Sequence, residues 1–578
     1  MLNKPVAAAG EATLDKSRPD GGEAMLEGLR GLGIDYIFTS PGSEWGGFWE
    51  AIARQKVYGT PGPEFVSCWH ETLAMDLALG YTLVTGRMQA VVLHAGVGLL
   101  QGGMGIQSAQ IQNLPVLVFS GESLTYGERE GFDPGSQWYQ NLSVVGGVSR
   151  IVEPFCKWSG QVPSVETLYN TVVRGGQIAQ RTPMGPVYIS VPIETQLQPW
   201  AKPARLARSK PAVPPRAPVP EIERVAQLLL KAKNPVITTE AAGRDAAGYN
   251  ALLELAEALA IPVIETTSTL FSNFYKGHPL HQGPSFAPYF ETTDLALVIR
   301  SRAPWYPPHK RPPNAEIVLI DENPFRHHMA YQNLHADSVL EGDVTFTLQT
   351  LAAAVKGKGG PEVEERRKRH AASHAKADEA RNIFLAAASK KPKIDPGLLS
   401  AMLSDTLPAN TVYVDESVTH RIPIEAHLRP KGAGSFLKVR GGLGQGIGHG
   451  LGAKIALPDQ PVVVLVGDGT FLYNPITQCL GFAEQMKLGI IIVVYNNNRY
   501  LAMKLDHARY YPDGVSKDKN IYVGEVIGSN PALERLGEPF GCWGRKVEHP
   551  DDLQAAIREA HAATLLGRTA ILNVMVDP

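Results

Sequence analysis

Short apolar runs alternate along the chain with longer segments in which apolar residues recur at helical spacing. Residues 462–466 are all apolar, and a glycine-rich turn and a helical stretch follow them. A second apolar run, residues 490–495, comes next and ends in three asparagines. Such continuous apolar runs predict strands that are buried on both faces, as in parallel sheets covered by helices. The pattern therefore predicts an α/β fold with mostly parallel sheets flanked by helices.

The first block of this alternation predicts one domain. Helical spacing over residues 22–32 leads into a predicted strand at 35–39, and the alternation continues to the apolar run at 187–192. We place this domain at residues 21–198, after a flexible N-terminal arm of residues 1–20. No apolar core of a signal peptide is present in that arm.

Two further domains follow a linker. Residues 199–220 are rich in proline and basic residues, which predicts an extended connection. The second domain is predicted at 221–355, a charged helical linker at 356–393 and the third domain at 394–578. The second domain's strands are predicted at residues 235–239, 261–265, 295–299 and 315–320.

Polar residues follow both predicted strands of the strand–helix–strand unit at residues 462–495. Gly467-Asp468-Gly469-Thr470 comes after the first strand, and Asn496-Asn497-Asn498 after the second. Ligands of open parallel sheets bind at the carboxyl ends of the strands. The glycines let the backbone approach a phosphate, and the helix that starts after Thr470 offers free N–H groups to an anion.

The same two turns predict a magnesium site. Asp468 and Asn497 provide hard oxygen donors, which suit a Mg²⁺ ion that also takes diphosphate oxygens. From spacing alone, Asn496 or Asn498 could replace Asn497 as the amide ligand. An ordinary strand–helix–strand unit with a glycine-rich turn is the structural alternative.

Composition narrows the class of protein. The 578 residues are 44% hydrophobic and 19% charged, which is typical of a soluble globular protein, and the net charge of −2 argues against a nucleic-acid partner. No apolar run reaches the ~18 residues of a membrane span, so we expect no membrane association. The scattered cysteines 68, 156, 479 and 542 form no metal-binding pattern, which predicts free thiols and a cytoplasmic location.

The glycine–aspartate–glycine turn followed by paired asparagines resembles the thiamine-diphosphate motif. Three α/β domains with this motif in the third resemble the thiamine-diphosphate decarboxylases and acetohydroxyacid synthases. The resemblance implies that the first domain binds the aminopyrimidine ring of the cofactor and the third binds its diphosphate. It also implies that Asp468, Asn497 and the carbonyl of Arg499 hold Mg²⁺. Active sites shared in a homodimer or homotetramer are a further implication, and flavin (FAD) binding in the central domain is left undecided.

Two more segments carry the resemblance. Cys68-Trp69-His70-Glu71-Thr72-Leu73-Ala74 is similar to the family's HExxA-type pattern, which implies that Glu71 exchanges a proton with the pyrimidine N1′. Gly441-Gly442-Leu443-Gly444 is similar to the turn that bends the cofactor, with Leu443 as the wedge and the Gly441 carbonyl as an acceptor. The loop at 415–419 resembles the family's phosphate-side loop, in which Thr419 donates to the diphosphate. A plain helix cap is the alternative there.

The substrate pocket resembles that of benzoylformate decarboxylase. Ser40-Pro41-Gly42-Ser43 is similar to its NPGS turn, which implies that Ser43 lies near the substrate carboxylate. Leu93-His94-Ala95-Gly96 is similar to its LHSAAG segment, so His94 falls at an active-site histidine, where acetohydroxyacid synthases carry a small polar residue.

Other pocket residues rest on weaker resemblance. His309 lies close to, but not in register with, a second active-site histidine from the central domain. Ala502 and Met503 follow the paired asparagines where pocket-lining residues occur, although ordinary core packing would also explain them.

Two positions depart from the family pattern. Glu122 stands where a glutamine is common, and Gln101 where an asparagine is usual. A carboxylate beside the cofactor disfavours an anionic substrate unless it is protonated or paired. Neutral acyloins and diketones therefore stay open as substrates.

The prediction is a Mg²⁺ and thiamine-diphosphate enzyme that cleaves or forms a carbon–carbon bond next to a carbonyl. Decarboxylation of a small 2-oxoacid, with or without carboligation, leads over an acetolactate-synthase-like carboligase and over acyloin or diketone cleavage. A catalytically idle homologue is disfavoured because Glu71, Asp468 and Asn497 occur together. A nucleotide-binding oxidoreductase is disfavoured because no clear GxGxxG turn opens a helix after a first strand.

Overall fold

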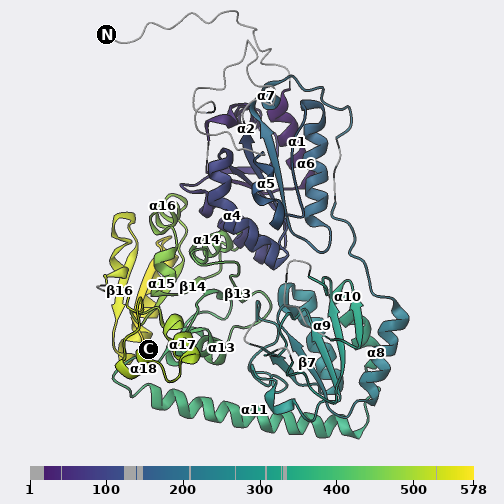
Figure 1. Ribbon diagram of the computed structural model, residues 1–578, viewed down its shortest axis with the longest axis vertical. Coiled ribbons are helices and arrows are strands. Elements are labelled where there is room, and N and C mark those ends of the chain that lie inside the picture. Colours follow the sequence, from purple (N-terminus) through teal and green to yellow (C-terminus); the bar gives the residue numbers. More distant parts are fainter. Residues whose placement is uncertain are drawn as a thin grey trace, which may run out of the picture.

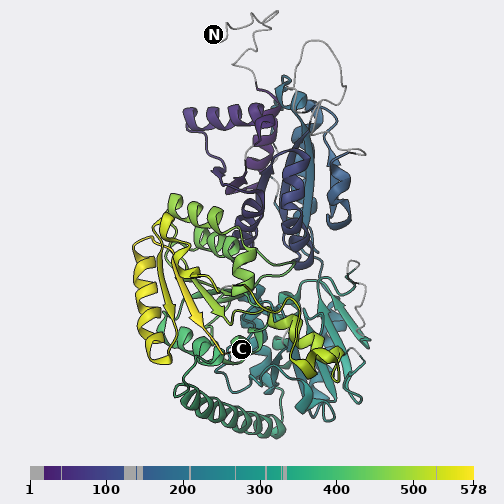
Figure 2. The same cartoon turned by 60° about the vertical axis from the view of Figure 1, so that its left-hand side comes forward.

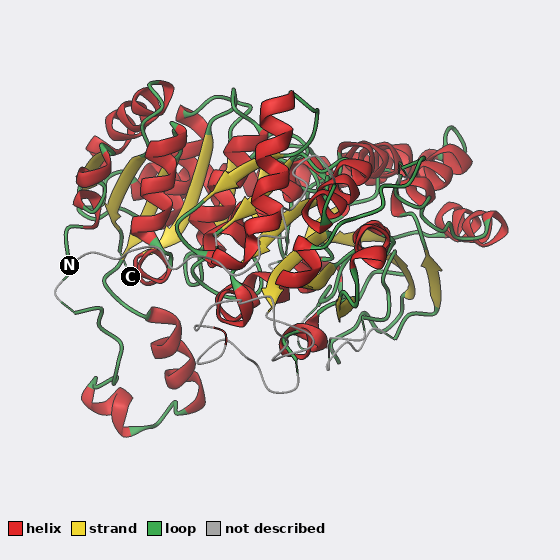
Figure 3. Cartoon of the chain, turned by 90° about the horizontal axis from the view of Figure 1, so that it is seen from above, coloured by secondary structure: helices red, strands yellow, loops and turns green. Residues whose placement is uncertain are grey.

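The computed structural model describes residues 19–40, 42–122, 138, 147–206, 208, 210–266, 269–305, 307, 309–326, 329, 335–528 and 530–577. These residues form three α/β domains, each built on one parallel sheet with helices against it (Figure 1). Figure 3 shows the strands lying between layers of helices. The predicted fold class is therefore confirmed.

The N-terminal domain has a six-stranded sheet in the order β2-β1-β3-β4-β6-β5. Its strands are β1 Tyr36–Thr39, β2 Glu64–Ser67, β3 Gln89–Leu93, β4 Val116–Glu122, β5 Trp158–Gln161 and β6 Pro186–Pro192. Its helices are α1 Gly21–Leu32, α2 Gly46–Tyr58, α3 Glu71–Thr85, α4 Ala95–Gln112, α5 Ser149–Val152, α6 Val165–Gln180 and α7 Ile193–Leu197. Strands β3 and β6 are buried along their whole length, which explains why their sequences are mostly apolar.

The central domain has a five-stranded sheet in the order β11-β10-β9-β7-β8. Its strands are β7 Pro235–Thr239, β8 Val263–Glu265, β9 Leu295–Ile299, β10 Glu316–Asp321 and β11 Ser338–Glu341. Its helices are α8 Val219–Lys231, α9 Ala246–Leu259 and α10 Val344–Val355. The charged stretch after it forms the long helix α11 Pro361–Ala388, which runs along one end of the molecule toward the third domain (Figure 1).

The C-terminal domain has a six-stranded sheet in the order β13-β12-β14-β15-β17-β16. Its strands are β12 Val412–Glu416, β13 Phe436–Lys438, β14 Val462–Gly467, β15 Ile491–Asn496, β16 Trp543–Val547 and β17 Ala570–Met575. Its helices are α12 Pro396–Thr406, α13 Arg421–His427, α14 Gly446–Ala456, α15 Asp468–Tyr473, α16 Ile476–Met486, α17 Leu501–Tyr510, α18 Val515–Lys519 and α19 Leu553–Leu565.

The helical stretch after the glycine–aspartate–glycine turn differs from its prediction. It begins at Asp468, earlier than the predicted start after Thr470, and it is two helices, α15 and α16. The break falls at Asn474-Pro475, because a proline ring disfavours helical backbone at the residue before it. The predicted strands agree with the observed ones to within a residue or two at their ends.

Helix α3 of the first domain packs closely on helix α14 of the third. A Cβ atom on Gly80 would lie 2.1 Å from the His449 carbonyl oxygen, and one on Gly452 would lie 2.2 Å from the Leu77 carbonyl oxygen. Only glycine allows the two backbones to approach so closely. Figure 2 shows the first domain at the end of the molecule opposite α11, with the third domain below it.

Most of the expected N-terminal arm lies outside the described residues. Asp20, at its end, caps α1 by accepting from Glu23 N at 2.9 Å. None of the described helices combines the length and the apolar character needed to cross a membrane. The four cysteines, all of them described, are unpaired.

Candidate active site

A buried carboxylate and a histidine meet at the carboxyl edge of the first sheet. Strands β1 and β3 are neighbours, so the segments that follow them lie together. Glu44 follows β1, is fully buried, and places its Oε2 atom 2.7 Å from His94 Nδ1. Its Oε1 atom accepts from the Ala95 N–H at 2.7 Å, at the first turn of α4, where the helix dipole favours a negative charge.

The backbone around this pair leaves no space for side chains. A Cβ atom on Gly42 would lie 2.1 Å from His94 Nδ1, and one on Gly121 would lie 2.0 Å from Glu44 Cγ. Gly42, the glycine of the predicted Ser-Pro-Gly-Ser turn, therefore cannot be replaced by a larger residue without displacing His94 or Glu44. Ser43, the predicted substrate-binding residue, begins the short 3₁₀ helix Ser43–Trp45 and is exposed next to the buried Glu44.

Glu71 lies beside His94. A Cβ atom on Gly98 would be 3.0 Å from His94 Cβ and 3.1 Å from Glu71 Oε1, so both side chains border the same glycine. Glu71 is the first residue of α3, and the ring of His70 caps this helix by accepting from Thr72 N at 3.1 Å. The structure thus brings together two of the three predicted catalytic residues.

The ionisation of His94 depends on its two acidic neighbours. The hydrogen bond to Glu44 raises the pKa of His94, burial lowers it, and the charges of Glu44 and Glu71 add to the increase. The histidine therefore keeps a proton to a higher pH than a free imidazole. Such a group can give a proton to, or take one from, a carbonyl oxygen placed against it.

A second group of polar atoms lies at the carboxyl edge of the third sheet. The Arg499 N–H is 3.2 Å from Asp468 Oδ2 and 3.0 Å from Asn497 Oδ1, so a carboxylate oxygen and an amide oxygen point to one position. The side chain of Arg499 turns away to Glu525, at 2.5 Å. Only the main chain of Arg499 faces this group.

The side chain of Asn496, which precedes Asn497, is engaged elsewhere. Asn496 donates to Asn573 Oδ1 at 2.9 Å, and its own Oδ1 accepts from Asn498 N at 2.9 Å. Asn497 Nδ2 lies 3.3 Å from His420 Nε2. Burial lowers the pKa of His420 to about 4, so this ring is neutral and can accept the amide hydrogen. The geometry favours Asn497 as the amide ligand.

The oxygens of Asp468 and Asn497 could hold a divalent metal only if a bound ligand supplied further oxygens. Among the described residues, no three His, Cys, Asp or Glu side chains gather closely enough to hold a metal ion. Burial raises the pKa of Asp468, which is 5% exposed, and a bound cation would offset that cost. The available donors are therefore hard oxygens that need further oxygens, such as those of a diphosphate.

Buried polar side chains that lack partners within the described part of the chain occur in two segments, just after β12 and just after the glycine-rich turn at Gly441. Among the described residues, the side-chain amide of Gln445 and the hydroxyl of Ser417 are buried without a hydrogen-bond partner. Gly441 has φ +120°, a conformation that a side chain would strain, and Leu443 beside it is half-buried. Gly467, Gly469 and Thr470 line the turn after β14, and Thr419 is half-buried after β12. These features suit a polar ligand with a phosphate group.

The contacts that His309, Ala502, Met503 and Gln101 make with the described residues do not join these predicted pocket residues to either group. His309 is exposed in the central domain, and Met503 is 54% exposed on α17 next to the half-buried Ala502. Gln101 is exposed, and its carbonyl accepts from Thr72 Oγ1 at 3.0 Å. Glu122 ends β4, and residues 123–137 after it lie outside the described part of the chain.

The sequence interpretation missed Glu44 and His420. Glu44 follows a predicted strand, but its link to His94 depends on β1 and β3 being neighbours, which the sequence alone does not state. His420 directly follows the candidate Thr419 but carries no pattern that points to Asn497.

Comparison with known proteins agrees with this geometry. Residues 19–142 match the N-terminal TPP binding domain of thiamine pyrophosphate enzymes, residues 222–351 match their central domain, and residues 419–572 match their C-terminal TPP binding domain. The chain therefore belongs to the thiamine pyrophosphate enzymes, a family of decarboxylases and carboligases.

Individual relatives are distant. The chain is 25% identical to acetolactate synthase isozyme 3 large subunit of Escherichia coli, over 96% of this chain and 95% of the relative. It is 24% identical to benzoylformate decarboxylase of Pseudomonas aeruginosa, over 83% of this chain and 86% of the relative. A solved structure of thiamine diphosphate-dependent 4-hydroxybenzoylformate decarboxylase from Rhodococcus jostii superimposes with a TM-score of 0.78 at 24% identity, covering 96% of this chain and 99% of that one.

Proposed function

We propose that the protein decarboxylates a small 2-oxoacid with thiamine diphosphate and Mg²⁺, with or without ligation of the product to a second carbonyl compound. The pairing of His94 with Glu44, next to Glu71, is the observation that supports this proposal. When bound, the cofactor supplies the carbon nucleophile and the electron sink. The residues of the chain supply binding, orientation and proton transfer.

Each residue of this cluster has a distinct role in the proposal. Glu71 holds the proton at the pyrimidine N1′. Glu44 occupies Nδ1 of His94, at 2.7 Å, and so leaves Nε2 to exchange a proton with the substrate oxygen. Ser43 binds the substrate carboxylate. Asp468, Asn497 and the Arg499 carbonyl hold Mg²⁺, and Thr419, Gly441, Gly467, Gly469 and Thr470 contact the cofactor, with Leu443 supporting its bent conformation.

An acetolactate-synthase-like carboligase is the second candidate. The Escherichia coli relative supports it by its similarity over nearly the whole chain. The His94–Glu44 pair favours decarboxylation, because a fixed acid–base group can protonate the product in place of a second substrate. Glu122 at the end of β4 keeps cleavage of a neutral acyloin or diketone as a third candidate.

We propose a homodimer or homotetramer in which two chains share each site. Within one chain, the contacts of the described residues do not join Glu71 to Asp468. Helix α4, which starts at this cluster, exposes Val97, Leu100 and Met104 by 45%, 61% and 37% of their surfaces. A row of exposed apolar side chains at helical spacing suits a protein interface. We place the protein in the cytoplasm, on the basis of its unpaired cysteines.

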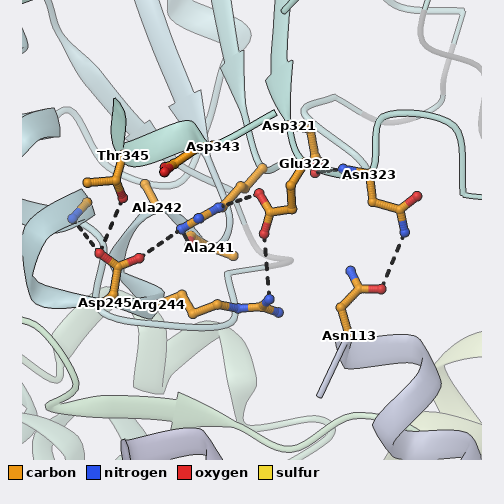
Figure 4. Close-up of polar contacts among 12 residues, drawn as sticks. Asn113, Ala241, Ala242, Arg244, Asp245, Asp321, Glu322, Asn323, Asp343 and Thr345 are labelled. Atoms are coloured by element: carbon orange, nitrogen blue, oxygen red, sulfur yellow. Dashed lines mark hydrogen bonds and ion pairs between the residues drawn. The ribbon is translucent and has the colours of Figure 1, made fainter. Parts of the chain in front are cut away.

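The proposed enzyme does not bind a flavin in its central domain. Its ligand crevice should lie between β7 and β9, where the strand order reverses. Ion pairs span this edge, because Arg300 contacts Glu322 at 2.7 Å and Asp245 at 3.3 Å. Figure 4 shows Asp245 and Glu322 at this edge. Asp245 also accepts from Gly248 N at 2.7 Å, at the helix start where a diphosphate would bind.

The same edge is used for contact with the first domain. Arg244 pairs with Glu322 at 3.6 Å and donates to the Gln112 carbonyl, at the end of α4. Asn323 Nδ2 lies 3.3 Å from Asn113 Oδ1, the residue after that helix (Figure 4). In this proposal, Arg244 and Asn323 therefore contact the end of α4 and not a nucleotide.

The decisive assay is CO₂ release from a panel of aliphatic and aromatic 2-oxoacids, with thiamine diphosphate and Mg²⁺ but no added flavin. We expect release from at least one member, and a His94→Ala variant that binds the cofactor but is about 10²–10⁴-fold slower. The visible spectrum of the purified protein should lack flavin absorbance. Turnover of acyloins or diketones without CO₂ release from any 2-oxoacid would replace the proposal by the third candidate.

Replacing Glu44 by glutamine tests the role of the histidine pair. The hydrogen bond that raises the pKa of His94 is weakened, so the limb of the pH–rate profile that reports His94 should move to lower pH. The pair stabilises the fold fully below the ordinary histidine pKa of about 6.5 and loses this effect as pH rises through the raised value. The variant should therefore lose more stability at acidic than at alkaline pH.

Two measurements check this expectation. The pH dependence of kcat reports the shift, and thermal unfolding at several pH values reports the stability difference. Glu50→Gln, an exposed carboxylate on α2, is the control and should change neither. A Glu44→Gln profile that superimposes on that of the wild type would contradict the proposed pair.

A further inference from the structure

Glu416 ends β12 and is a second buried carboxylate whose contacts join separate segments. Its Oε1 atom accepts from the Gln445 N–H at 2.7 Å, in the turn that precedes α14. Its Oε2 atom accepts from Asn474 Nδ2 at 3.0 Å, at the end of α15. Glu416 is 4% exposed, so water does not compete for these contacts.

Asn474 completes the connection. Its Nδ2 atom also donates to the Thr470 carbonyl at 2.9 Å, and its Oδ1 atom accepts from the Ile447 N–H at 3.0 Å. Asn474 is 5% exposed. The two side chains therefore connect three backbone segments: the end of β12, the glycine-rich turn with the start of α14, and the turn after β14.

The fit around Glu416 is close. A Cβ atom on Gly446 would lie 2.8 Å from both Cβ and Oε2 of Glu416, so the turn is packed directly against this side chain. Burial raises the pKa of Glu416 to about 7, although the N–H groups of Gln445, Gly446 and Gly444 and the Asn474 amide oppose the increase. Burying a carboxylate at this cost fits a role that an apolar residue could not fill.

We infer that Glu416 and Asn474 are positioning residues for the cofactor. The three segments they connect carry Thr419, Leu443 and the Gly467–Thr470 turn, which the proposed function assigns to thiamine diphosphate. The inference rests on that proposal for these assignments. Neither side chain is expected to touch the cofactor, because its polar atoms already bind backbone N–H groups and the other side chain.

The same connection reaches the helix that carries Glu71. A Cβ atom on Gly448 of α14 would lie 2.5 Å from the Cβ of Asp76 on α3. The start of α14 is thus fixed by Glu416 on one side and by α3 on the other. Loosening Glu416 should disturb the diphosphate turn more than α3, which has the core of the first domain behind it.

The test compares cofactor affinity with stability in Glu416→Gln, Glu416→Ala and Asn474→Ser. Calorimetric titration of the apo protein with thiamine diphosphate at fixed Mg²⁺ gives Kd, and thermal unfolding of the apo protein gives Tm. We expect Glu416→Ala to raise Kd roughly ten- to hundred-fold, because hydrogen bonds to a charged group are lost. Glu416→Gln keeps one acceptor oxygen and should fall between wild type and alanine.

Glu425→Gln is the matched control. Glu425 lies in the same domain, its side chain is 8% exposed, and burial raises its pKa to about 7, yet it belongs to α13 near the central domain. It should leave Kd within about two-fold of wild type. If Glu416→Ala does not fold, the Kd and Tm values of Glu416→Gln and Asn474→Ser test the positioning role instead.

Three outcomes separate the claims. A raised Kd in the Glu416 and Asn474 variants alone supports the positioning role. A lowered apo Tm with unchanged Kd, or an equal loss of affinity in Glu425→Gln, overturns it and leaves a structural role only. A wild-type protein that binds thiamine diphosphate but releases no CO₂ refutes the proposed reaction and not this inference, since the inference is measured by binding.

Discussion

Asp468→Ala should strongly weaken the Mg²⁺-dependent binding of thiamine diphosphate, and catalysis with it. Asp468 is the anionic member of the proposed metal site, because Asn497 and the Arg499 carbonyl are neutral. We compare its loss with breaking a buried ion pair, at about 3–5 kcal/mol, which corresponds to a Kd raised roughly one hundred- to several thousand-fold. Calorimetric titration of the apo variant with thiamine diphosphate at fixed Mg²⁺ measures this change in Kd.

Asp459→Ala is the control for this variant. Asp459 is an exposed aspartate in the turn between α14 and β14, on the same domain. Its removal should leave Kd unchanged. An Asp468→Ala protein with the affinity of wild type would rule out the metal assignment.

Glu71→Gln should preserve the fold and the affinity for the cofactor while slowing turnover about 10²–10⁴-fold. The glutamine amide has nearly the shape of the carboxyl group but cannot hold the exchangeable proton. Exchange of the cofactor's C2 proton, followed by quenched-flow NMR, should slow in parallel. His94→Ala should leave that exchange near the wild-type rate, since His94 acts on the substrate; slowing in both variants would mean that the two roles are not separable.

The strands and their polar ends were the most predictable part of the molecule. Apolar runs such as 462–466, each bounded by turn residues, are typical of buried strands in a parallel sheet, and the residues after such strands gather at one edge. Spacing left three asparagines as possible ligands. The structure favours Asn497 over Asn496, because the Asn496 side chain turns inward to Asn573, whereas Asn497 and Asp468 both accept from the Arg499 N–H.

Buried acids were the least predictable part. Composition favours exposed glutamates, so nothing local marked Glu44 or Glu416 as buried. Each is buried because it meets N–H groups from a segment far away in the chain, His94-Ala95 for Glu44 and Gln445 for Glu416. Such pairs depend on which strands are neighbours, which a single sequence does not state. His309 shows the converse, because its resemblance was local and its position is exposed.

The shared site can be tested most directly by mixing two inactive variants, Glu71→Gln and Asp468→Ala, and measuring CO₂ release from the best 2-oxoacid. In a hybrid dimer, one of the two sites has both Glu71 and Asp468 intact, so we predict that activity returns to about a quarter of the wild-type value after subunits exchange randomly. Mass spectrometry of differently labelled chains verifies the exchange. Hybrid dimers that form without regaining activity, or a fully active monomer, would contradict the account.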